Sequence, residues 1–194
     1  MRWNKYGHAV LFSGNEKHRN GVGFIVENCS NNIRGFFGIS DRVSVLKMRT
    51  THADVCLIQV YAPTSDSTEE SLSQFYHQLE EAMKLSKHKE MLLVMGDFNA
   101  KIGSGEDEGL VGRHGLGKTN DRGAVLCEWC QSKNLCIVYT WFQKSESKLR
   151  TWKSPNGLTK HQIDYISTSK RFFNAVLDVN AIQNADCGSD HNPV

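Results

Sequence analysis

The sequence predicts an α/β fold of two packed sheets flanked by helices. Three observations lead to this: short alternating segments separated by turns, one long amphipathic helix, and one unbroken apolar run. Hairpins before and after a helix, with a fully buried strand between them, are typical of two packed sheets with helices outside. The chain has 194 residues, 39% of them hydrophobic, which is enough for one large core. We expect a single domain over residues 1–194.

Period-two alternation bounded by turn residues predicts the strands. The first four form antiparallel hairpins, and the fifth stops at Ala62-Pro63. An apolar run without alternation predicts a strand buried on both faces. The expected strands are 8–13, 21–26, 34–40, 42–49, 54–61, 91–95, 136–142, 149–153, 162–168 and 176–182.

Two helices are predicted, over residues 67–85 and 121–133. Ser67 and Glu70 have the spacing of a capping box at the start of the first. Apolar residues at helical spacing share one face of that helix. They are Leu72, Phe75, Tyr76, Leu79 and Met83.

Composition and charge narrow the class of protein. The net charge of +2 is too small to indicate nucleic-acid binding by itself. No apolar stretch approaches the roughly 20 residues of a membrane span, and no apolar signal-peptide core follows the N-terminus. We therefore expect an intracellular protein of the nucleus or cytoplasm, neither secreted nor membrane-bound. Six irregularly spaced cysteines fit reduced thiols better than a disulfide framework.

Polar residues directly follow the predicted buried strand. The run 91–95 is followed by Gly96, Asp97, Phe98 and Asn99. Open sheets build sites at the carboxyl ends of strands, where an acid and an amide can aim a water and an oxyanion donor at one point. The alternative is an ordinary turn, because Asp and Asn favour turns. The residues alone leave both interpretations open.

Two later segments place acids beside candidate partners. Within 162–166, Asp164 shares a face with Gln162, and an acid inside a strand requires a partner. Near the C-terminus, Asp190 precedes His191, the side-chain type that carries protons near neutral pH. The structural alternatives are a salt-bridged strand acid and an exposed turn.

In chain order these motifs resemble the endonuclease/exonuclease/phosphatase superfamily, which includes apurinic endonucleases and deoxyribonuclease I. The residues within these motifs most resemble the craniofacial development protein 2-like branch, which is similar to endonuclease domains of RTE-type retrotransposons. The resemblance covers essentially the whole chain. It is carried by RNGVGFIV at 19–26, VYAP at 60–63, GDFN at 96–99, TW at 151–152, QIDYI at 162–166 and SDH at 189–191.

The resemblance implies a four-layer sandwich of the deoxyribonuclease I type and a metal-dependent hydrolase. The reaction would be phosphodiester hydrolysis in DNA, at apurinic or target sites, in which a water is aligned and charge on the phosphoryl oxygens is neutralised. It implies that Asp97 orients or deprotonates the water and that Asn99 hydrogen-bonds the phosphoryl group.

The remaining roles also come from the resemblance. His191 would contact the phosphate while Asp164 holds its other ring nitrogen. Tyr61 would donate its hydroxyl to the phosphate. Asp190 would lie at a divalent metal, Mg²⁺ with Mn²⁺ as the alternative, because hard cations prefer carboxylate and phosphate oxygens.

The sequence also departs from the family pattern. The family motifs begin with an Asn and a metal-binding Glu on the first strands, and residues 1–3 resemble the stretch just after that Glu. We therefore expect a domain incomplete at its N- and C-terminal strands, with impaired cleavage that an upstream segment carrying both residues restores. The competing expectation is an inactive remnant that serves as a binding or vestigial module. The sequence does not indicate the oligomeric state.

Basic residues interleaved with aromatic ones can follow a nucleic-acid backbone. Such residues gather between 144 and 160 and predict a DNA contact, against the alternative of a solvated hairpin loop. They are Lys144, Lys148, Arg150, Trp152 and Lys153.

Two other motifs are weaker. Residues 112–119 fit a P-loop pattern. A P-loop directly follows a buried strand, and no predicted strand leads into these residues, so nucleotide binding is the least favoured of the functional hypotheses. Cys127 and Cys130 are spaced as a metal-binding pair, but no second close pair follows. We interpret them as thiols packed on a helix.

Overall fold

The computed structural model describes residues 2–3, 8–16, 20–105, 109–183, 185 and 188–194. They fall into two compact units, Met1–Gly96 and Asp97–Val194, which we describe separately. Within the described ranges, no helix has both the length and the apolar character needed to cross a bilayer.

The first unit contains two packed sheets. One has the strand order β1 (Arg2–Trp3), β2 (Ala9–Gly14), β3 (Gly21–Val26). The other begins with β4 (Ile33–Gly38), β5 (Val43–Met48), β6 (Val55–Tyr61) and β7 (Met91–Asp97). A short 3-10 helix, η1 (Ser30–Asn32), precedes β4. Neighbouring strands from β1 to β3 and from β4 to β6 are antiparallel.

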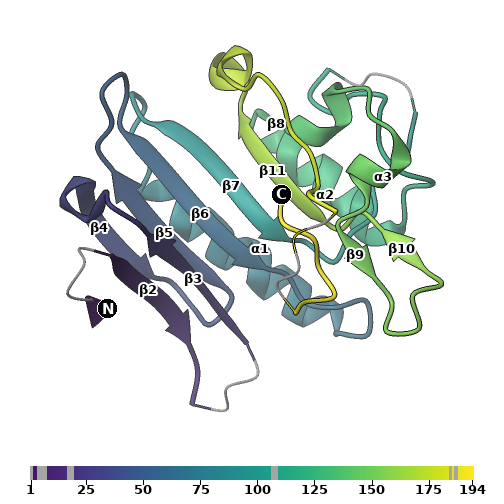
Figure 1. The fold of residues 1–194 in the computed structure, drawn as a ribbon, viewed down its shortest axis with the longest axis horizontal. Helices are drawn as coiled ribbons and strands as arrows, with labels where there is room; N and C mark the ends of the chain where they lie inside the picture. The colour runs from purple at the N-terminus through teal and green to yellow at the C-terminus, as the bar shows by residue number, and fades with distance from the viewer. Residues whose placement is uncertain (1, 4–7, 17–19, 106–108, 184, 186–187) are drawn as a thin grey trace. The chain divides into compact units, whose positions relative to one another are not determined.

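The two sheets and helix α1 (Glu69–Lys84) form three layers of this unit (Figure 1). Leu46 and Leu57 are paired across β5 and β6 and pack against Ala9 and Leu11 of β2. The opposite face of the same sheet carries Lys47, whose Nζ donates to the carbonyl oxygen of Leu85 just after α1 at 2.8 Å. Alternation along β5 and β6 therefore directs one face to the small sheet and the other to α1.

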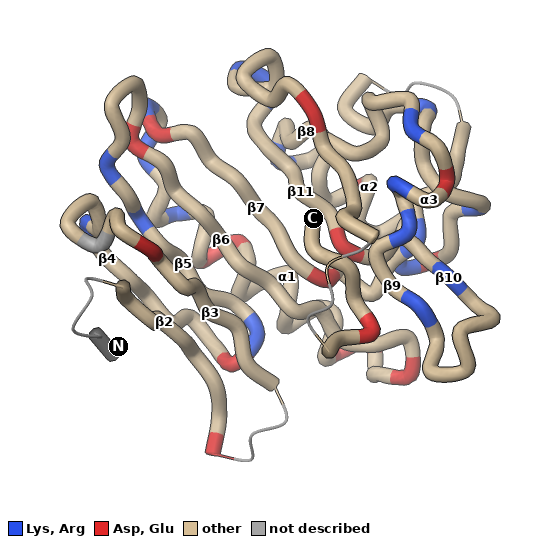
Figure 2. Tube along the Cα trace, viewed as in Figure 1, with Lys and Arg blue, Asp and Glu red and all other residues tan. Residues whose placement is uncertain are grey.

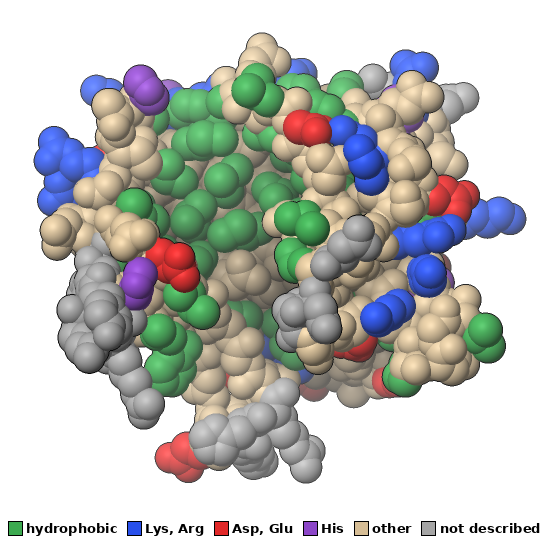
Figure 3. All heavy atoms as spheres, viewed as in Figure 1, with side chains coloured by type: hydrophobic (Ala, Val, Ile, Leu, Met, Phe, Trp, Pro, Cys, Tyr) green, Lys and Arg blue, Asp and Glu red, His purple; other side chains and the backbone are tan. Residues whose placement is uncertain are grey.

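Strands β6 and β7 alternate between buried and half-buried residues. Apolar side chains gather over this part of the sheet on the face turned away from α1 (Figure 3). Val55 and Leu57 of β6, with Met91, Leu93 and Met95 of β7, make up the half-buried apolar set. Such a sequence pattern suits strands that are covered on both faces.

The second unit holds the remaining elements. Helix α2 (Asp121–Ser132) packs against β8 (Leu135–Ile137), and β8 pairs antiparallel with β11 (Asp164–Ser169). The sequence between β8 and β11 forms η2 (Val138–Trp141), α3 (Glu146–Leu149) and two antiparallel strands, β9 (Trp152–Lys153) and β10 (Lys160–His161). Helix η3 (Lys170–Ala175) follows β11.

The expected α/β class with two packed sheets and helices is confirmed. The first six predicted strands are present, 21–26 with the predicted ends and the other five with shifted ends. Helix α1 begins later than predicted, because Thr68 rather than Ser67 accepts the capping hydrogen bond, from the Ser71 amide at 3.2 Å. A strand over 136–142 is wrong beyond Ile137. There the chain enters the 3-10 helix η2, and the Thr140 hydroxyl donates to the Ile137 carbonyl oxygen at 2.7 Å.

Two other predicted strands need correction. Of 149–153, only Trp152–Lys153 is a strand, because Leu149 ends α3. Residues 176–182 form no strand, because the amides of Ala181 and Ile182 bond to two segments that lie far apart in the chain. Ala181 donates to the Lys148 carbonyl oxygen at 2.9 Å and Ile182 to that of Pro193 at 2.8 Å.

Gly96 fixes how the chain leaves β7. Its φ is +138°, and a Cβ at this position would lie 2.1 Å from the Val60 carbonyl oxygen. We predict that Gly96→Ala lowers the free energy of unfolding by about 2–4 kcal/mol, through backbone strain and overpacking together. Urea denaturation measures this.

Gly109→Ala is the matched control. Gly109 also has a positive φ, +84°, but nothing lies within 4 Å of its added Cβ. It should lose only the backbone term, about 1 kcal/mol. Equal losses of unfolding free energy in the two variants would show that the close approach to the Val60 carbonyl oxygen does not contribute to the cost.

Candidate active site

Asp97 and Asn99 lie where β7 ends. The Asp97 carboxylate accepts the Asn99 backbone amide at 2.8 Å and the Asn99 side-chain amide at 3.3 Å. Asn99 has a φ of +48°, a conformation that Asn tolerates better than most residues. The Phe98 amide between them donates to the Ile163 carbonyl oxygen at 2.9 Å. This bond ties the end of β7 to the residue just before Asp164.

An imidazole lies between two carboxylates. His191 Nδ1 is 2.9 Å from Asp164 Oδ2 and 3.2 Å from Oδ1. On the other side of the ring, Nε2 is 4.0 Å from Asp97 Oδ2. The side chains of Asp97 and Asp164 are 14% and 18% exposed, and that of His191 is 31% exposed. The cluster is therefore partly desolvated but still accessible from solvent.

Burial and charge shift the proton affinities of this cluster. Burial, followed by the charge of Asp164, raises the pKa of Asp97 to about 6, against the opposing hydrogen bond from the Asn99 amide. The hydrogen bond to Asp164 raises the pKa of His191, and burial opposes it. A carboxyl with a raised pKa beside an imidazolium stabilised by an acid is a pattern of acid–base sites.

Asp190 directly precedes His191, and its side chain is hydrogen-bonded by Trp152. The indole Nε1 of Trp152 donates to Asp190 Oδ2 at 2.8 Å, and the Lys153 amide donates to the Asp190 carbonyl oxygen at 3.0 Å. Trp152 also stacks on His161, with ring centroids 5.7 Å apart. The indole fixes the direction of the Asp190 carboxylate, a contact across 38 residues of sequence that no local motif predicts.

The carboxylates of this site fit a divalent metal only with ligands supplied by water and phosphate. Within the described part of the chain, no three or more His, Cys, Asp or Glu side chains form a group that could hold a metal ion. Mg²⁺, however, is usually bound by one or two carboxylates and completed by water and phosphate oxygens. The exposed carboxylate of Asp190 fits that donor chemistry.

Tyr61 is the last residue of β6, in the first unit. The Arg42 guanidinium lies 5.1 Å from the centre of its ring, and Arg42 Nη1 donates to its carbonyl oxygen at 3.1 Å. The role of Tyr61 stays a prediction.

The basic residues predicted to contact DNA lie on and around α3, β9 and β10 (Figure 2). Lys144 forms an ion pair with Asp178, and Arg150 forms one with Glu146 at 2.6 Å. Lys148 and Lys153 are exposed. These two are therefore the better placed of the four cations for a solvent-side ligand.

The P-loop pattern does not have P-loop geometry. Instead of following a strand, residues 112–119 pair with the preceding loop. The Ser104 amide donates to Gly117, and the Leu116 amide donates to Ile102, at 3.2 and 3.1 Å. The Thr119 hydroxyl accepts the Gly103 amide at 3.0 Å, which occupies the group that a P-loop offers to Mg²⁺.

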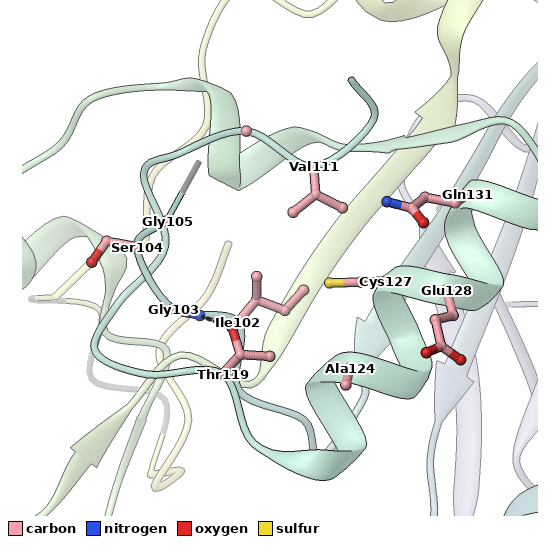
Figure 4. Close-up of a pocket in the computed structure, with 11 residues that line it drawn as sticks. Ile102, Gly103, Ser104, Gly105, Val111, Thr119, Ala124, Cys127, Glu128 and Gln131 are labelled. Atoms are coloured by element: carbon pink, nitrogen blue, oxygen red, sulfur yellow. Dashed lines mark hydrogen bonds between the residues drawn. The ribbon is translucent and has the colours of Figure 1, made fainter. Parts of the chain in front are cut away.

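The two thiols on α2 are separated by their surroundings. Cys130 is fully buried, and burial raises its pKa far above the ordinary value. Cys127 points into a cavity of about 290 Å³ beside Ile102 and Val111 (Figure 4). Cys130 is therefore a packed helix thiol, as predicted. Cys127 is on the same helix but lines the cavity.

A family model described as Endonuclease-reverse transcriptase matches residues 55–194. The chain belongs to this family. Craniofacial development protein 2 from Bos taurus is 37% identical over 98% of the chain, and that from Tragulus javanicus is 36% identical over 98%. The chain spans about a third of these relatives, 34% and 35% of their lengths. The resemblance to the endonuclease/exonuclease/phosphatase superfamily and its craniofacial development protein 2-like branch is thereby confirmed.

Solved structures share the fold. The endonuclease domain of TRAS1, a telomere-specific non-LTR retrotransposon, matches with a TM-score of 0.67 and 15% identity, over 95% of this chain and 75% of its own. The AP endonuclease LMAP from Leishmania major matches at 0.69 and 14%, over 95% and 68%. The Neisseria 3′ phosphatase NExo, bound to a product DNA hairpin, matches at 0.66 and 17%, over 95% and 77%.

These matches confirm a fold of the deoxyribonuclease I type. The family is one of nucleases and phosphatases, which are hydrolases, and its nucleases generally use divalent metal ions.

The raised pKa of Asp97 gives a first prediction for the site. The folded protein binds this proton more tightly than the unfolded chain, whose carboxyl has the ordinary pKa of 3.8. The resulting stability is present below pH ~4 and is lost as the pH rises through about 6. Asp97→Asn should therefore raise the free energy of unfolding by up to roughly 3 kcal/mol near neutral pH, and leave it unchanged in acid.

Urea denaturation across this pH range, without divalent metal, measures the effect. Asp66→Asn is the control, because Asp66 is exposed. A destabilised Asp97→Asn protein near neutral pH would contradict the assignment.

A second prediction concerns His191. Because the Asp164 hydrogen bond is the main cause of its raised pKa, Asp164→Asn should lower that pKa. Titration of the imidazole signals by NMR measures this, with exposed His77 as the internal reference. An unmoved His191 pKa would mean that Asp164 does not hold the ring.

Proposed function

We propose that this site hydrolyses phosphodiester bonds in DNA with the help of a divalent metal. The supporting observation is the imidazole of His191 between the carboxylates of Asp164 and Asp97. An imidazole held by one acid, with a second acid of raised pKa beside it, offers a proton donor and a proton acceptor at one place.

His191 acts on the phosphate. Asp164 accepts from Nδ1, so in the protonated ring Nε2 is free to donate a hydrogen bond to a phosphoryl oxygen. The negative charge of Asp164 keeps the ring protonated to higher pH, so the imidazolium also offsets the charge that develops on the phosphoryl group.

Asp97 acts on the water. With a pKa of about 6, its carboxyl is mostly ionised near neutral pH and basic enough to accept a proton, which is the compromise a general base requires. Asn99 lies one hydrogen bond away, and its side-chain amide donates to the phosphoryl group. Asp97 therefore orients or deprotonates the water while Asn99 positions the bond that breaks.

Asp190 would hold the metal, Mg²⁺ or Mn²⁺, with water and phosphate oxygens completing its ligands. When bound, the metal neutralises charge on the phosphoryl and leaving oxygens. The exposed carboxylate of Asp190 is oriented by its hydrogen bond from the Trp152 indole. Because one carboxylate binds Mg²⁺ weakly, we expect impaired activity that rises steeply with metal concentration.

DNA as the substrate is supported by the names of the similar proteins: a retrotransposon endonuclease, an AP endonuclease and a phosphatase bound to a DNA hairpin. The family description couples an endonuclease to a reverse transcriptase, so we also propose a retrotransposon origin. Apurinic DNA and an intact target site are the two substrate types. The proposed backbone contacts are Lys148 and Lys153, both exposed, of which Lys153 directly follows Trp152 in β9.

Nicking of supercoiled plasmid and of an abasic duplex, with Mg²⁺, Mn²⁺ or EDTA, tests this function. We predict metal-dependent nicking that Asp97→Ala and His191→Ala each reduce by about 100-fold or more, the scale on which essential groups act. Tyr61→Phe in the same assay tests the predicted hydroxyl donor.

Lys118→Ala is the matched control. Lys118 is an exposed residue of the segment 112–119 that fits the P-loop pattern, so its loss should leave nicking unchanged. Nicking that survives in EDTA or in Asp97→Ala would contradict the proposal. DNA binding by the wild type without any nicking would favour the second candidate, a binding module that has lost catalysis.

A further inference from the structure

We propose that Thr151 is the positioning residue that sets the Asp164–His191 pair. Its hydroxyl oxygen holds the backbone at Asp164, and its main chain holds the segment that carries His191. The purpose of the pair rests on the proposed function, but the positioning itself is a geometric claim about this chain.

The hydroxyl organises the start of β11. Thr151 is fully buried, and its Oγ1 accepts two successive backbone amides, from Ile163 at 3.0 Å and Asp164 at 3.1 Å. The pairing of β11 with β8 lies further along, at Ser167–Ser169. Two amides that converge on one oxygen fix the peptide plane at Asp164, and with it the direction in which the carboxylate leaves the backbone.

The main chain of the same residue holds the C-terminal segment. The Asn192 amide donates to the Thr151 carbonyl oxygen at 2.7 Å, and the Thr151 amide donates to the His161 carbonyl oxygen at 2.9 Å. Trp152 and His191 face each other as an isolated antiparallel bridge. His191 is therefore anchored through a residue on either side of it, at Asp190 and at Asn192.

Thr151 thus links two segments that are 27 residues apart in sequence. The imidazole–carboxylate contact at 2.9 Å tolerates little displacement, because a hydrogen bond weakens steeply with distance and angle. Sites of this kind work only when their supporting contacts hold them to within a fraction of an ångström. A buried residue that bonds to both segments meets that requirement.

The competing account is that Thr151 serves stability alone. Removing a buried acceptor of two amides costs about 1–3 kcal/mol for each unsatisfied group, wherever it lies. The two accounts therefore differ only in what happens to His191, and the test must report on that ring directly.

The experiment compares Thr151→Val, which keeps the shape and removes the acceptor, with Thr151→Ser, which keeps the acceptor. Each protein is labelled with ¹⁵N in its histidines, and the ring signals are recorded at one pH where His191 is neutral. His191→Gln assigns the signal. The signature is a downfield proton on Nδ1, the tautomer that donation to Asp164 selects.

We expect the Nδ1 signature in the wild type and in Thr151→Ser, and its loss in Thr151→Val. Thr140→Val is the matched control. Thr140 is equally buried in the same unit, and its hydroxyl bonds the Gly112 amide and the Ile137 carbonyl oxygen. That variant should keep the signature. A folded Thr151→Val protein that keeps it, or a Thr140→Val protein that loses it as well, would overturn the proposal.

If Thr151→Val does not fold, Thr151→Cys replaces it, because a thiol of similar size accepts hydrogen bonds weakly. Amide exchange in the wild type is a further check. The Ile163 and Asp164 amides must both be protected, and exchange at the rate of free amides at either would also overturn the proposal. None of these readouts needs DNA, metal or turnover, so failure of the proposed hydrolysis and failure of the positioning claim are distinguishable.

Discussion

The hydrogen bond between the Asp164 carboxylate and Nδ1 of His191 is the interaction on which the site depends. It closes a loop between β11 and the last described segment of the chain, and it turns Nε2 towards Asp97, 4.0 Å away. Without it, two partly buried carboxylates would repel each other with no positive charge between them. The same interaction therefore sets the orientation of the ring and favours its protonated form.

This arrangement has a cost in stability. Asp97 is desolvated beside another acid, which is unfavourable for folding and raises its pKa. The surrounding structure holds it there. Gly96 allows a backbone conformation that brings β7 close to Val60, and the Phe98 amide bonds to Ile163. A partly desolvated pair of acids held in place by its surroundings is consistent with the proposed catalytic role.

Sequence reasoning located the parts that depend on local pattern. The apolar run before Gly96 predicts the end of β7, and the alternation in 162–166 predicts an acid in need of a partner. His191 is that partner. The strand at 176–182 was wrong, because the destination of its amides, such as the bond from Ile182 to Pro193, is set by tertiary contacts. For the same reason no local signal linked Trp152 to Asp190, although both residues stood in recognised motifs.

The central claim is that the imidazole of His191 receives the phosphate of a DNA strand. The most direct measurement is the ¹⁵N NMR signal of His191 Nε2 during titration with a short abasic duplex in EDTA, with exposed His77 as reference. The account predicts a saturable shift of His191 Nε2 at an unchanged His77 signal, and loss of that shift in Asp164→Ala. DNA binding that moves signals around Lys148 and Lys153 and leaves His191 unmoved would contradict it.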